Sequence, residues 1–195
     1  MDFDGSAIAQ LLNDAVDRGA LAGVAAIVVS AEGPLHRSDA GTVNAGTMFR
    51  NASMTKAPAT AGALQLVEQG RLDLDAKVES ILPEFGDLQV LEGFDGDTLI
   101  LRAPASKPTI RQLATHTAGC GYFFTSERLH RHGELTGFPN PLSGLKSSLS
   151  TPLVNDPGTV WEYGVNVDWL GLVVQEVSGQ KLDAISASTS TGRSA

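Results

Sequence analysis

The sequence predicts an α+β fold, with helices packed on an antiparallel sheet and a largely helical second lobe. Three observations lead to this prediction. A helical pattern in residues 8–16 is followed by a hairpin pattern in residues 23–40. Between Lys56 and Glu68 no side chain is charged, which is typical of a core helix. A third apolar helix pattern occupies residues 168–177.

The first helix is predicted from apolar residues that recur at the spacing of one helix face. Asp4 or Ser6 can cap its start, and Gly19 marks its end. The apolar face consists of Ile8, Leu11, Leu12, Ala15 and Val16. A small, β-branched run at 23–30 follows, and after a turn with Gly and Pro we expect residues 35–40 to pair with it as a β-hairpin.

Residues 57–67 form the longest apolar segment, and their apolar side chains point in every direction around a helix. We therefore expect a core helix that is buried nearly all round. Lys56 stands in its first turn, where it faces the positive end of the helix dipole, and burial also disfavours a charged amine. Both effects predict a lowered pKa for Lys56.

Ser53 lies three residues before Lys56, on the same helix face. A partly neutral lysine can take a proton from a hydroxyl, so we interpret the pair as a nucleophile and its base. The spacing recurs at Ser143/Lys146 and Ser178/Lys181, but only Ser53 is expected between a strand and a buried helix. The alternative is that Ser53 caps the helix and Lys56 extends to water.

The middle of the chain carries two local signals. The Asp-Gly-Asp sequence at 95–97 predicts a hairpin turn within the loop-rich residues 86–108. The capping-box spacing of Thr109 and Gln112 predicts a short helix through Leu113.

Tyr163 is predicted at the corner between an extended stretch and the helix of residues 168–177. A phenol normally titrates at about pH 10, so Tyr163 can act as a base near neutral pH only if a cation such as Lys56 stabilises its anion. The alternative is a buried tyrosine whose hydroxyl is satisfied.

The composition argues against several classes of function. The net charge is -8, from 14 basic and 22 acidic residues without a basic cluster, so nucleic-acid binding is not expected. No apolar stretch reaches the roughly 20 residues of a membrane span. The acidic N-terminus does not resemble a signal peptide, and Cys120 is the single cysteine. We expect a cytoplasmic protein without a membrane partner.

His116, Cys120, His130 and His132 are the remaining candidates for chemistry. Their spacing fits none of the usual zinc patterns, so we expect no metal site and no cofactor. A metal site or a thiol–histidine pair is the alternative. We interpret the histidines as surface residues of a loop and Cys120 as a small neutral residue near the site.

Three motifs occur in order: Ser-Met-Thr-Lys at 53–56, Thr-His-Thr-Ala-Gly at 115–119, and Pro-Gly followed by Trp-Glu-Tyr within 157–163. Together they resemble the β-lactamase-related serine hydrolases, most closely the class C β-lactamases and the β-lactamase-like carboxylesterases. The resemblance covers residues 11–179 and includes Gly-Arg-Leu-Asp-Leu-Asp at 70–75. It implies a β-lactamase/transpeptidase-like fold.

The resemblance implies that Ser53 attacks an ester or amide carbonyl, that Lys56 and Tyr163 manage the proton, and that water cleaves the acyl-enzyme. The backbone N–H of Ser53 would supply half of the oxyanion hole. In β-lactamases and peptidases of this family the tyrosine is followed by a small residue and Asn, whereas Asn166 comes one place late here. This favours small esters over the lactam substrates of a β-lactamase or the peptides of a DD-peptidase.

The family's third motif, a Lys, His or Trp followed by a small residue and Gly on a C-terminal strand, is not found in the sequence. We therefore expect residues 1–182 to be the N-terminal portion of a β-lactamase-related domain, and residues 183–195 to be a disordered low-complexity tail. Unpaired sheet edges would favour self-association. Slow labelling of Ser53 with little turnover is expected, and a non-catalytic fragment or binding module is the alternative.

Overall fold

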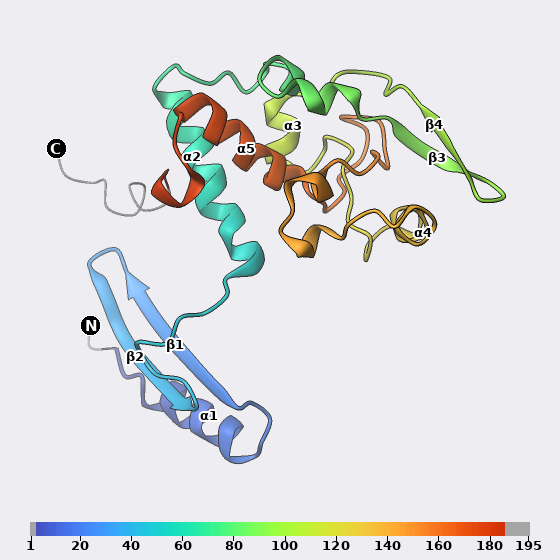
Figure 1. Ribbon diagram of the computed structural model, residues 1–195. Helices are drawn as coiled ribbons and strands as arrows, with labels where there is room; N and C mark the ends of the chain where they lie inside the picture. The colour runs from blue at the N-terminus through green and yellow to red at the C-terminus, as the bar shows by residue number, and fades with distance from the viewer. Residues whose placement is uncertain (1–2, 186–195) are drawn as a thin grey trace. The chain divides into compact units, whose positions relative to one another are not determined.

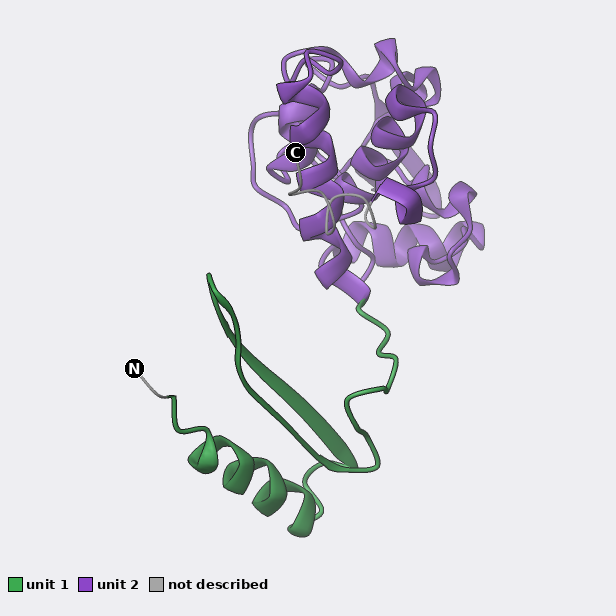
Figure 2. Cartoon of the chain, turned by 90° about the vertical axis from the view of Figure 1, so that its left-hand side faces the viewer, with its two compact units in different colours: residues 1–51 green, residues 52–195 purple. Residues whose placement is uncertain are grey.

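The computed structural model describes residues 3–185 (Figure 1). The chain folds into two compact units, Met1–Asn51 and Ala52–Ala195, which Figure 2 shows in different colours. The first unit contains a helix and a hairpin, and the second contains the remaining helices and a second hairpin.

In the first unit, helix α1 (Ser6–Asp17) packs against an antiparallel hairpin of β1 (Gly23–Ser30) and β2 (Gly33–Gly41). The pairing runs from Gly23 opposite Gly41 to Ser30 opposite Gly33. The predicted helix and hairpin are therefore confirmed. Gly5 stands at the N-cap position, and the carboxylate of Asp4, one of the two predicted caps, accepts the N–H of Ser6, the first residue of the helix, at 2.9 Å.

The second unit is built around two helices, α2 (Lys56–Glu68) and α5 (Asn166–Ser178), which pack against each other. The prediction that α2 is buried nearly all round is wrong. Its buried residues are Ala59, Gly62, Ala63 and Leu66, whereas Leu64 is 46% exposed. Within this unit α2 packs on α5 by one face. The prediction failed because alanines are found on both buried and exposed helix faces, so an alanine-rich sequence does not show which face is covered.

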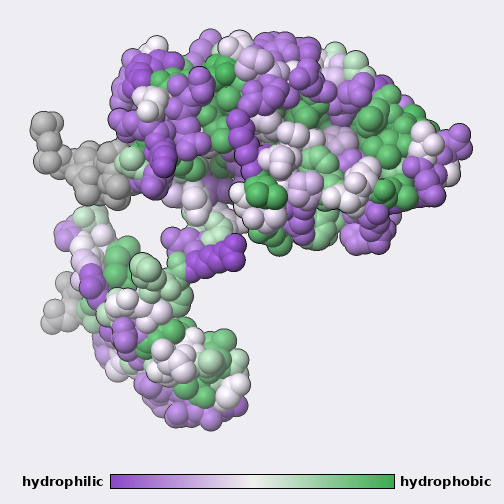
Figure 3. All heavy atoms as spheres, in the orientation of Figure 1, coloured by the Kyte–Doolittle hydropathy of each residue, from purple (hydrophilic) through white to green (hydrophobic). Residues whose placement is uncertain are grey.

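The predicted hairpin turn and the predicted capped helix are both present. Strands β3 (Val90–Asp95) and β4 (Thr98–Arg102) pair on either side of the turn. Helix α3 (Ile110–Ala114) begins with the complete capping box of Thr109 and Gln112. On the face seen in Figure 3, apolar side chains gather over the β3–β4 hairpin, where Ile100 and Leu101 are exposed.

Short helical elements connect these parts of the second unit. Helix α4 begins after the N-cap Ser126, whose hydroxyl accepts the backbone N–H of Leu129, and ends at Gly137 in the left-handed region. The elements are η1 (Ala52–Thr55), η2 (Val78–Ser80), η3 (Pro83–Asp87), α4 (Glu127–Thr136), η4 (Pro141–Ser143) and η5 (Lys146–Leu149).

The core of the second unit surrounds α5. Trp169 is fully buried, its ring meets Phe85 edge-on with centroids 5.0 Å apart, and its indole N–H donates to the backbone oxygen of Leu149 at 3.1 Å. Leu170 on the same helix and Ile110 on α3 are also fully buried. This packing fixes the start of α5, which carries part of the candidate site.

Residues 182–185 form one helical turn, and Ile185 is buried in the core. The disorder expected from residue 183 onward therefore does not extend to residues 183–185, because Ile185 has a place in the core. The rest of the expected tail, residues 186–195, lies outside the described residues. No helix in residues 3–185 is both long and apolar enough to cross a membrane.

Candidate active site

The candidate nucleophile stands on a tight turn at the start of the second unit. Ser53 lies in η1, and α2 begins directly afterwards at Lys56. The expected strand before Ser53 is absent from the described residues, which have an irregular segment there. Ala52 has a positive φ of 45°, an uncommon conformation for a residue with a side chain. The entry to this turn is therefore strained.

The three predicted catalytic side chains lie together. Tyr163 Oη donates a hydrogen bond to Ser53 Oγ at 2.7 Å, and Lys56 Nζ donates to the same oxygen at 3.4 Å. The Lys56 ammonium also lies over the Tyr163 ring, 5.2 Å from its centroid. The proximity is a finding, whereas the catalytic roles of the three residues stay a prediction.

The other two Ser-x-x-Lys pairs have different surroundings. Lys146 Nζ pairs with Glu84 at 3.1 Å, and Ser178 Oγ donates to the backbone oxygen of Gln175 at 3.4 Å. Of the three pairs, only Ser53 and Lys56 are joined by a hydrogen bond in the part of the chain that the structure describes.

Lys56 has two further partners that the sequence analysis missed. Its Nζ donates to Tyr122 Oη at 3.1 Å and lies 3.9 Å from Asp168 Oδ2. Tyr122 Oη in turn donates to Asp168 Oδ2 at 3.1 Å. The signals were an aromatic residue just after the 115–119 motif and an acidic residue in the first turn of an apolar helix.

The predicted lowering of the Lys56 pKa is wrong. Burial does lower the pKa of Lys56, but the hydrogen bond with Tyr122 and the negative charge of Asp168 outweigh burial and raise it above its ordinary value. Burial and the charge of Asp168 also raise the pKa of Tyr122. The site therefore holds the Lys56 ammonium group beside the neutral phenol of Tyr122.

Tyr163 reaches Ser53 because two distant segments run side by side through backbone hydrogen bonds. The N–H of Val154 donates to the oxygen of Gly119 at 2.7 Å, that of Gly158 to Thr117 at 2.7 Å, and that of Glu162 to His116 at 2.9 Å. Gly158 has a positive φ of 84°, and a Cβ there would lie 2.7 Å from the Gln112 side chain. The segment that delivers Tyr163 is thus anchored on the 115–119 motif.

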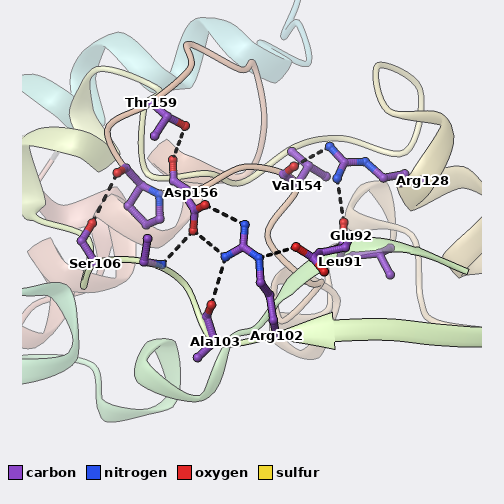
Figure 4. Close-up of polar contacts among 11 residues, drawn as sticks. Leu91, Glu92, Arg102, Ala103, Ser106, Arg128, Val154, Asp156 and Thr159 are labelled. Carbon is purple, nitrogen blue, oxygen red and sulfur yellow. Dashed lines mark hydrogen bonds and ion pairs between the residues drawn. The ribbon is translucent and has the colours of Figure 1, made fainter.

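A charged cluster holds the beginning of the same segment (Figure 4). The Arg102 guanidinium donates two hydrogen bonds to the Asp156 carboxylate, at 2.8 and 2.6 Å, and a third to Glu92 Oε1 at 2.6 Å. The backbone N–H of Ala105 also donates to Asp156 at 2.8 Å. Hydrogen bonds from Arg102 and Ala105 lower the pKa of Asp156 to about 2. Asp156 therefore links β4 to the turn before Tyr163.

His116 and Asn166 support the other side of Tyr163. The ring centroids of His116 and Tyr163 are 5.0 Å apart, and the Asn166 amide lies 3.2 Å from His116 Nδ1. Burial and the charge of Lys56 lower the pKa of His116, so its ring is neutral near pH 7. Asn166 is fully buried, and its Nδ2 also donates to the backbone oxygens of Cys120 and Glu162. The late asparagine thus contacts the ring beside the tyrosine.

The remaining candidate residues stand apart from this chemistry. Cys120 is buried, and burial raises the pKa of its thiol. His132 is buried on α4 with its ring tilted against that of Phe138, centroids 5.3 Å apart, so its predicted surface position is wrong. Within residues 3–185 no group of three or more His, Cys, Asp or Glu could hold a metal ion.

A cavity of about 350 Å³ opens beside the site, between α2 and α5. Lys56 and Asp168 line it, together with apolar or small residues such as Ala59, Leu145 and Gly171. Trp161, which is 64% exposed, lies near the ring of Tyr163, with centroids 6.5 Å apart. The cavity reaches Ala52, Thr55 and Lys56, the neighbours of Ser53 along the chain, and can accept a small, mainly apolar group beside the site.

Residues 8–188 match the family model described as Beta-lactamase. The chain belongs to the Beta-lactamase family. Its helices and antiparallel hairpins are those of the β-lactamase/transpeptidase-like fold, as expected from the three motifs. The family match runs through η1, α2 and the segments that bring Ser53, Lys56 and Tyr163 together.

Two of the curated relatives that the chain matches are named as an acyltransferase and an esterase. The chain is 41% identical to the monacolin J acid methylbutanoyltransferase of Aspergillus terreus over 141 residues, and 39% identical to the lovastatin esterase of Penicillium rubens over 134 residues. These matches cover 70% and 67% of this chain, and 34% of each relative. The chain thus spans about a third of the length of the curated relatives it matches.

A solved structure of the Beta-lactamase family agrees with this assignment. Unliganded simvastatin synthase (LovD) from Aspergillus terreus superposes with a TM-score of 0.78 and 32% sequence identity. The match covers 93% of this chain and 51% of LovD. The fold of the chain therefore corresponds to part of a larger Beta-lactamase-family structure.

Proposed function

We propose that the chain is a serine hydrolase scaffold that cleaves small carboxylic esters through an acyl-enzyme on Ser53. The observation that carries this proposal is the pair of hydrogen bonds to Ser53 Oγ, from Tyr163 Oη at 2.7 Å and from Lys56 Nζ at 3.4 Å. These contacts place two groups that can exchange protons within hydrogen-bond reach of Ser53 Oγ, and Tyr163 can take the serine proton once its own hydroxyl proton has passed to solvent.

The reactive form arises when the Tyr163 hydroxyl, which donates to Ser53 Oγ in the structure, gives its proton to solvent. In the acylation step, Ser53 Oγ bonds to the carbonyl carbon of the ester, and the proton of Ser53 passes to the Tyr163 phenolate. The adjacent Lys56 ammonium stabilises that phenolate. The carbonyl oxygen becomes an oxyanion, for which we assign the backbone N–H of Ser53 as one donor. When the bond to the alcohol breaks, Tyr163 returns the proton to the leaving alkoxide, and water repeats the sequence to release the acid.

The surroundings of Ser53 support a small neutral ester as the substrate class. The adjacent cavity of about 350 Å³ is within the range of small-molecule sites, and apolar residues contribute much of its lining. Both the relative named as an esterase and the relative named as a methylbutanoyltransferase act, by their names, on ester chemistry. Hydrolysis of a β-lactam or a DD-peptide is the less favoured alternative.

Acyl transfer is a second candidate function, because an alcohol can release the same acyl-enzyme in place of water. The observation that favours it is the 41% identity to a methylbutanoyltransferase. In that reaction the alcohol hydroxyl attacks the acyl carbon, and its proton takes the path assigned to water. The product would be a new ester instead of an acid.

The test measures Ser53-dependent reactions of the chain. p-Nitrophenyl butyrate, with and without an added alcohol, distinguishes hydrolysis from transfer, and a fluorophosphonate probe labels an activated serine even if turnover is slow. We expect labelling that disappears in Ser53→Ala and ester cleavage faster than penicillin cleavage. Labelling that persists in Ser53→Ala contradicts the assigned nucleophile. Absence of labelling in the wild-type chain supports a non-catalytic binding module instead.

A further inference from the structure

A directed chain of hydrogen bonds leads from Lys56 to Asp168. Lys56 Nζ donates to Tyr122 Oη at 3.1 Å, and Tyr122 Oη donates to Asp168 Oδ2 at 3.1 Å. The direct distance from Lys56 Nζ to the same carboxylate oxygen is 3.9 Å. Lys56 is 19% exposed and Asp168 is 39% exposed, so this chain is partly shielded from water.

The direction of this chain follows from the chemistry of its ends. An ionised carboxylate only accepts hydrogen bonds, so the single hydroxyl proton of Tyr122 is directed at Asp168. The remaining lone pairs of Tyr122 Oη can then accept an N–H from Lys56. If Tyr122 instead turned its proton towards a neutral Lys56 amine, it would leave Asp168 without that donor. A neutral amine could also donate to Tyr122 Oη, so the ammonium form is favoured by the Asp168 carboxylate, 3.9 Å from Lys56 Nζ, together with this acceptor.

The two tyrosines beside Lys56 have different environments. Tyr122 is buried and bonded to a carboxylate, and burial together with the charge of Asp168 raises its pKa. Tyr163 donates to Ser53 Oγ. Pairs of similar groups placed in different environments commonly take different roles in a site. Tyr122 is thus committed to holding Lys56, and Tyr163 is the tyrosine that meets the nucleophile.

We propose that Tyr122 and Asp168 are positioning residues that hold Lys56 as an ammonium group directed at Ser53. The proposal deepens the proposed function and rests on it, since it assumes that Ser53 is the nucleophile. Tyr122 and Asp168 act through Lys56 and do not touch Ser53 themselves in the described hydrogen bonds. Tyr122 and Asp168 thus stand behind the three predicted catalytic residues and keep Lys56 positively charged.

Other ionisable groups near Lys56 do not replace Asp168. His116 is kept neutral by burial and by the charge of Lys56, and Tyr163 contributes its ring face and hydroxyl. The ionisable groups that face Lys56 or line the same cavity are Asp168 on α5, Tyr122 and His116 in the segment after α3, Tyr163 in the segment before α5, and Lys146 on η5. Asp168 is the carboxylate among these groups.

The direct test is an NMR titration of Lys56 in the chain labelled with ¹³C at lysine side chains, with the Lys56 signal assigned from its loss in Lys56→Arg. We expect Asp168→Asn and Tyr122→Phe each to shift the Lys56 titration to lower pH, because each removes an interaction that stabilises the ammonium form. Glu176→Gln is the matched control, since Glu176 is exposed on the same helix. It is expected to leave the titration unchanged.

The second measurement is the rate of fluorophosphonate labelling of Ser53 between pH 6 and pH 11. We expect Asp168→Asn and Tyr122→Phe to slow labelling by roughly tenfold to a hundredfold at pH 8, through misplacement of Lys56. The labelling rate should also fall at high pH as Lys56 loses its proton, and in both variants this fall should occur at lower pH than in the wild type. Asp168→Glu keeps the charge and is expected to recover part of the rate. Circular dichroism and thermal melting establish that each variant is folded.

Two outcomes would overturn the proposal. One is an unchanged Lys56 titration in both folded variants, which would mean that Tyr122 and Asp168 do not set the charge of Lys56. The other is faster labelling of Asp168→Asn near pH 7, which would identify the neutral amine as the working form. Labelling that persists in Ser53→Ala would contradict the proposed function instead. The NMR titration would still test whether Tyr122 and Asp168 keep Lys56 in the ammonium form.

Discussion

Tyr163 Oη lies 2.7 Å from Ser53 Oγ although 110 residues separate the two along the chain. Ser53 stands on η1 at the start of α2, and Tyr163 stands just before α5. The packing of α2 against α5 brings both starts together, and the backbone ladder to the 115–119 motif aligns the segment before α5. The candidate site therefore depends on two helix starts held by one core.

Replacement of Tyr163 by Phe tests the proton-transfer role. The change removes the hydroxyl bonded to Ser53 and keeps the ring that packs near His116. We expect the rate of p-nitrophenyl butyrate cleavage to fall by about 10²- to 10⁴-fold, the range for a lost general acid–base group. Thr136→Val is the control, because it removes a hydroxyl of α4 that donates to the backbone oxygen of His132 and accepts the backbone N–H of Phe138, neither of which bonds to Ser53. Equal rates in Tyr163→Phe and the wild type would refute the role.

The three copies of the Ser-x-x-Lys spacing allow a matched test of Lys56. Lys56→Met removes the ammonium beside Ser53 and Tyr163, so we expect fluorophosphonate labelling to slow by at least about 10²-fold. Lys181→Met changes the lysine of another copy, which is exposed and lies three residues beyond the end of α5, and should label like the wild type. If both variants slow equally, the effect comes from net charge and not from the position of Lys56.

The local signals of the sequence predicted much of the fold. The capping box of Thr109 and Gln112 and the turn at 95–97 each depend on neighbouring residues, so both were predicted correctly. The burial of α2 was overestimated, because the composition of a helix does not show how many neighbours cover it. At the start of α1 the predicted partner Asp4 does bond the first helical N–H, that of Ser6, but it does so from one residue before the N-cap position, which Gly5 occupies.

The site was predictable only in part for a related reason. Ser53 and Lys56 are close in sequence, and Tyr163 was placed with them by the order of three motifs. Tyr122 and Asp168 lie 66 and 112 residues from Lys56 along the chain. Contacts over such separations are not encoded in any local spacing of the sequence. The sign of the Lys56 pKa shift depends on those two partners, so dipole and burial alone predicted the wrong direction.

Asp156 should make stability depend on pH in the acid range. Its bonds to Arg102 and Ala105 lower its pKa to about 2 in the folded chain, below the ordinary value of about 4 for an unfolded chain. The stabilisation is therefore present above about pH 4 and is lost as pH falls towards about 2. We expect the Tm of Asp156→Asn to be lower than that of the wild type at pH 6, with a difference that narrows below pH 4.

The control for this titration is Asp87→Asn, because the Asp87 side chain is exposed on η3. Its melting profile should follow the wild type between pH 6 and pH 2. A Tm difference for Asp156→Asn that stays constant over this range would show that the ion pair with Arg102 does not form in solution.

The core around α5 can be tested with the two tryptophans. Trp169 is fully buried against Phe85, so Trp169→Ala should lower the free energy of unfolding by roughly 3–5 kcal/mol. Trp161 is 64% exposed, and Trp161→Ala should cost less than about 1 kcal/mol. Urea titrations followed by circular dichroism measure both. Similar losses for the two variants would contradict the described packing of Trp169.

Gly164 should be required for the position of Tyr163. A Cβ at Gly164 would come within 2.5 Å of the backbone oxygen of Cys120 and the Cα of Gly121, and rigid backbone cannot yield as a flexible side chain can. Gly164→Ala must therefore push apart the segments that carry Tyr163 and Tyr122. We expect labelling of Ser53 to fall by about 10²-fold or more, because a displacement on the order of 1 Å has this effect on a reacting group.

The matched control is Gly133→Ala on α4, where a new Cβ meets no atom within 4 Å and the φ angle is helical. Alanine is the better helix former, so this variant should gain roughly 0.5–1 kcal/mol in unfolding free energy and label at the wild-type rate. Mass spectrometry of the fluorophosphonate adduct measures labelling in both variants, and urea titration measures stability. A folded Gly164→Ala that labels as fast as Gly133→Ala would show that Tyr163 does not depend on the close approach of these two backbone segments.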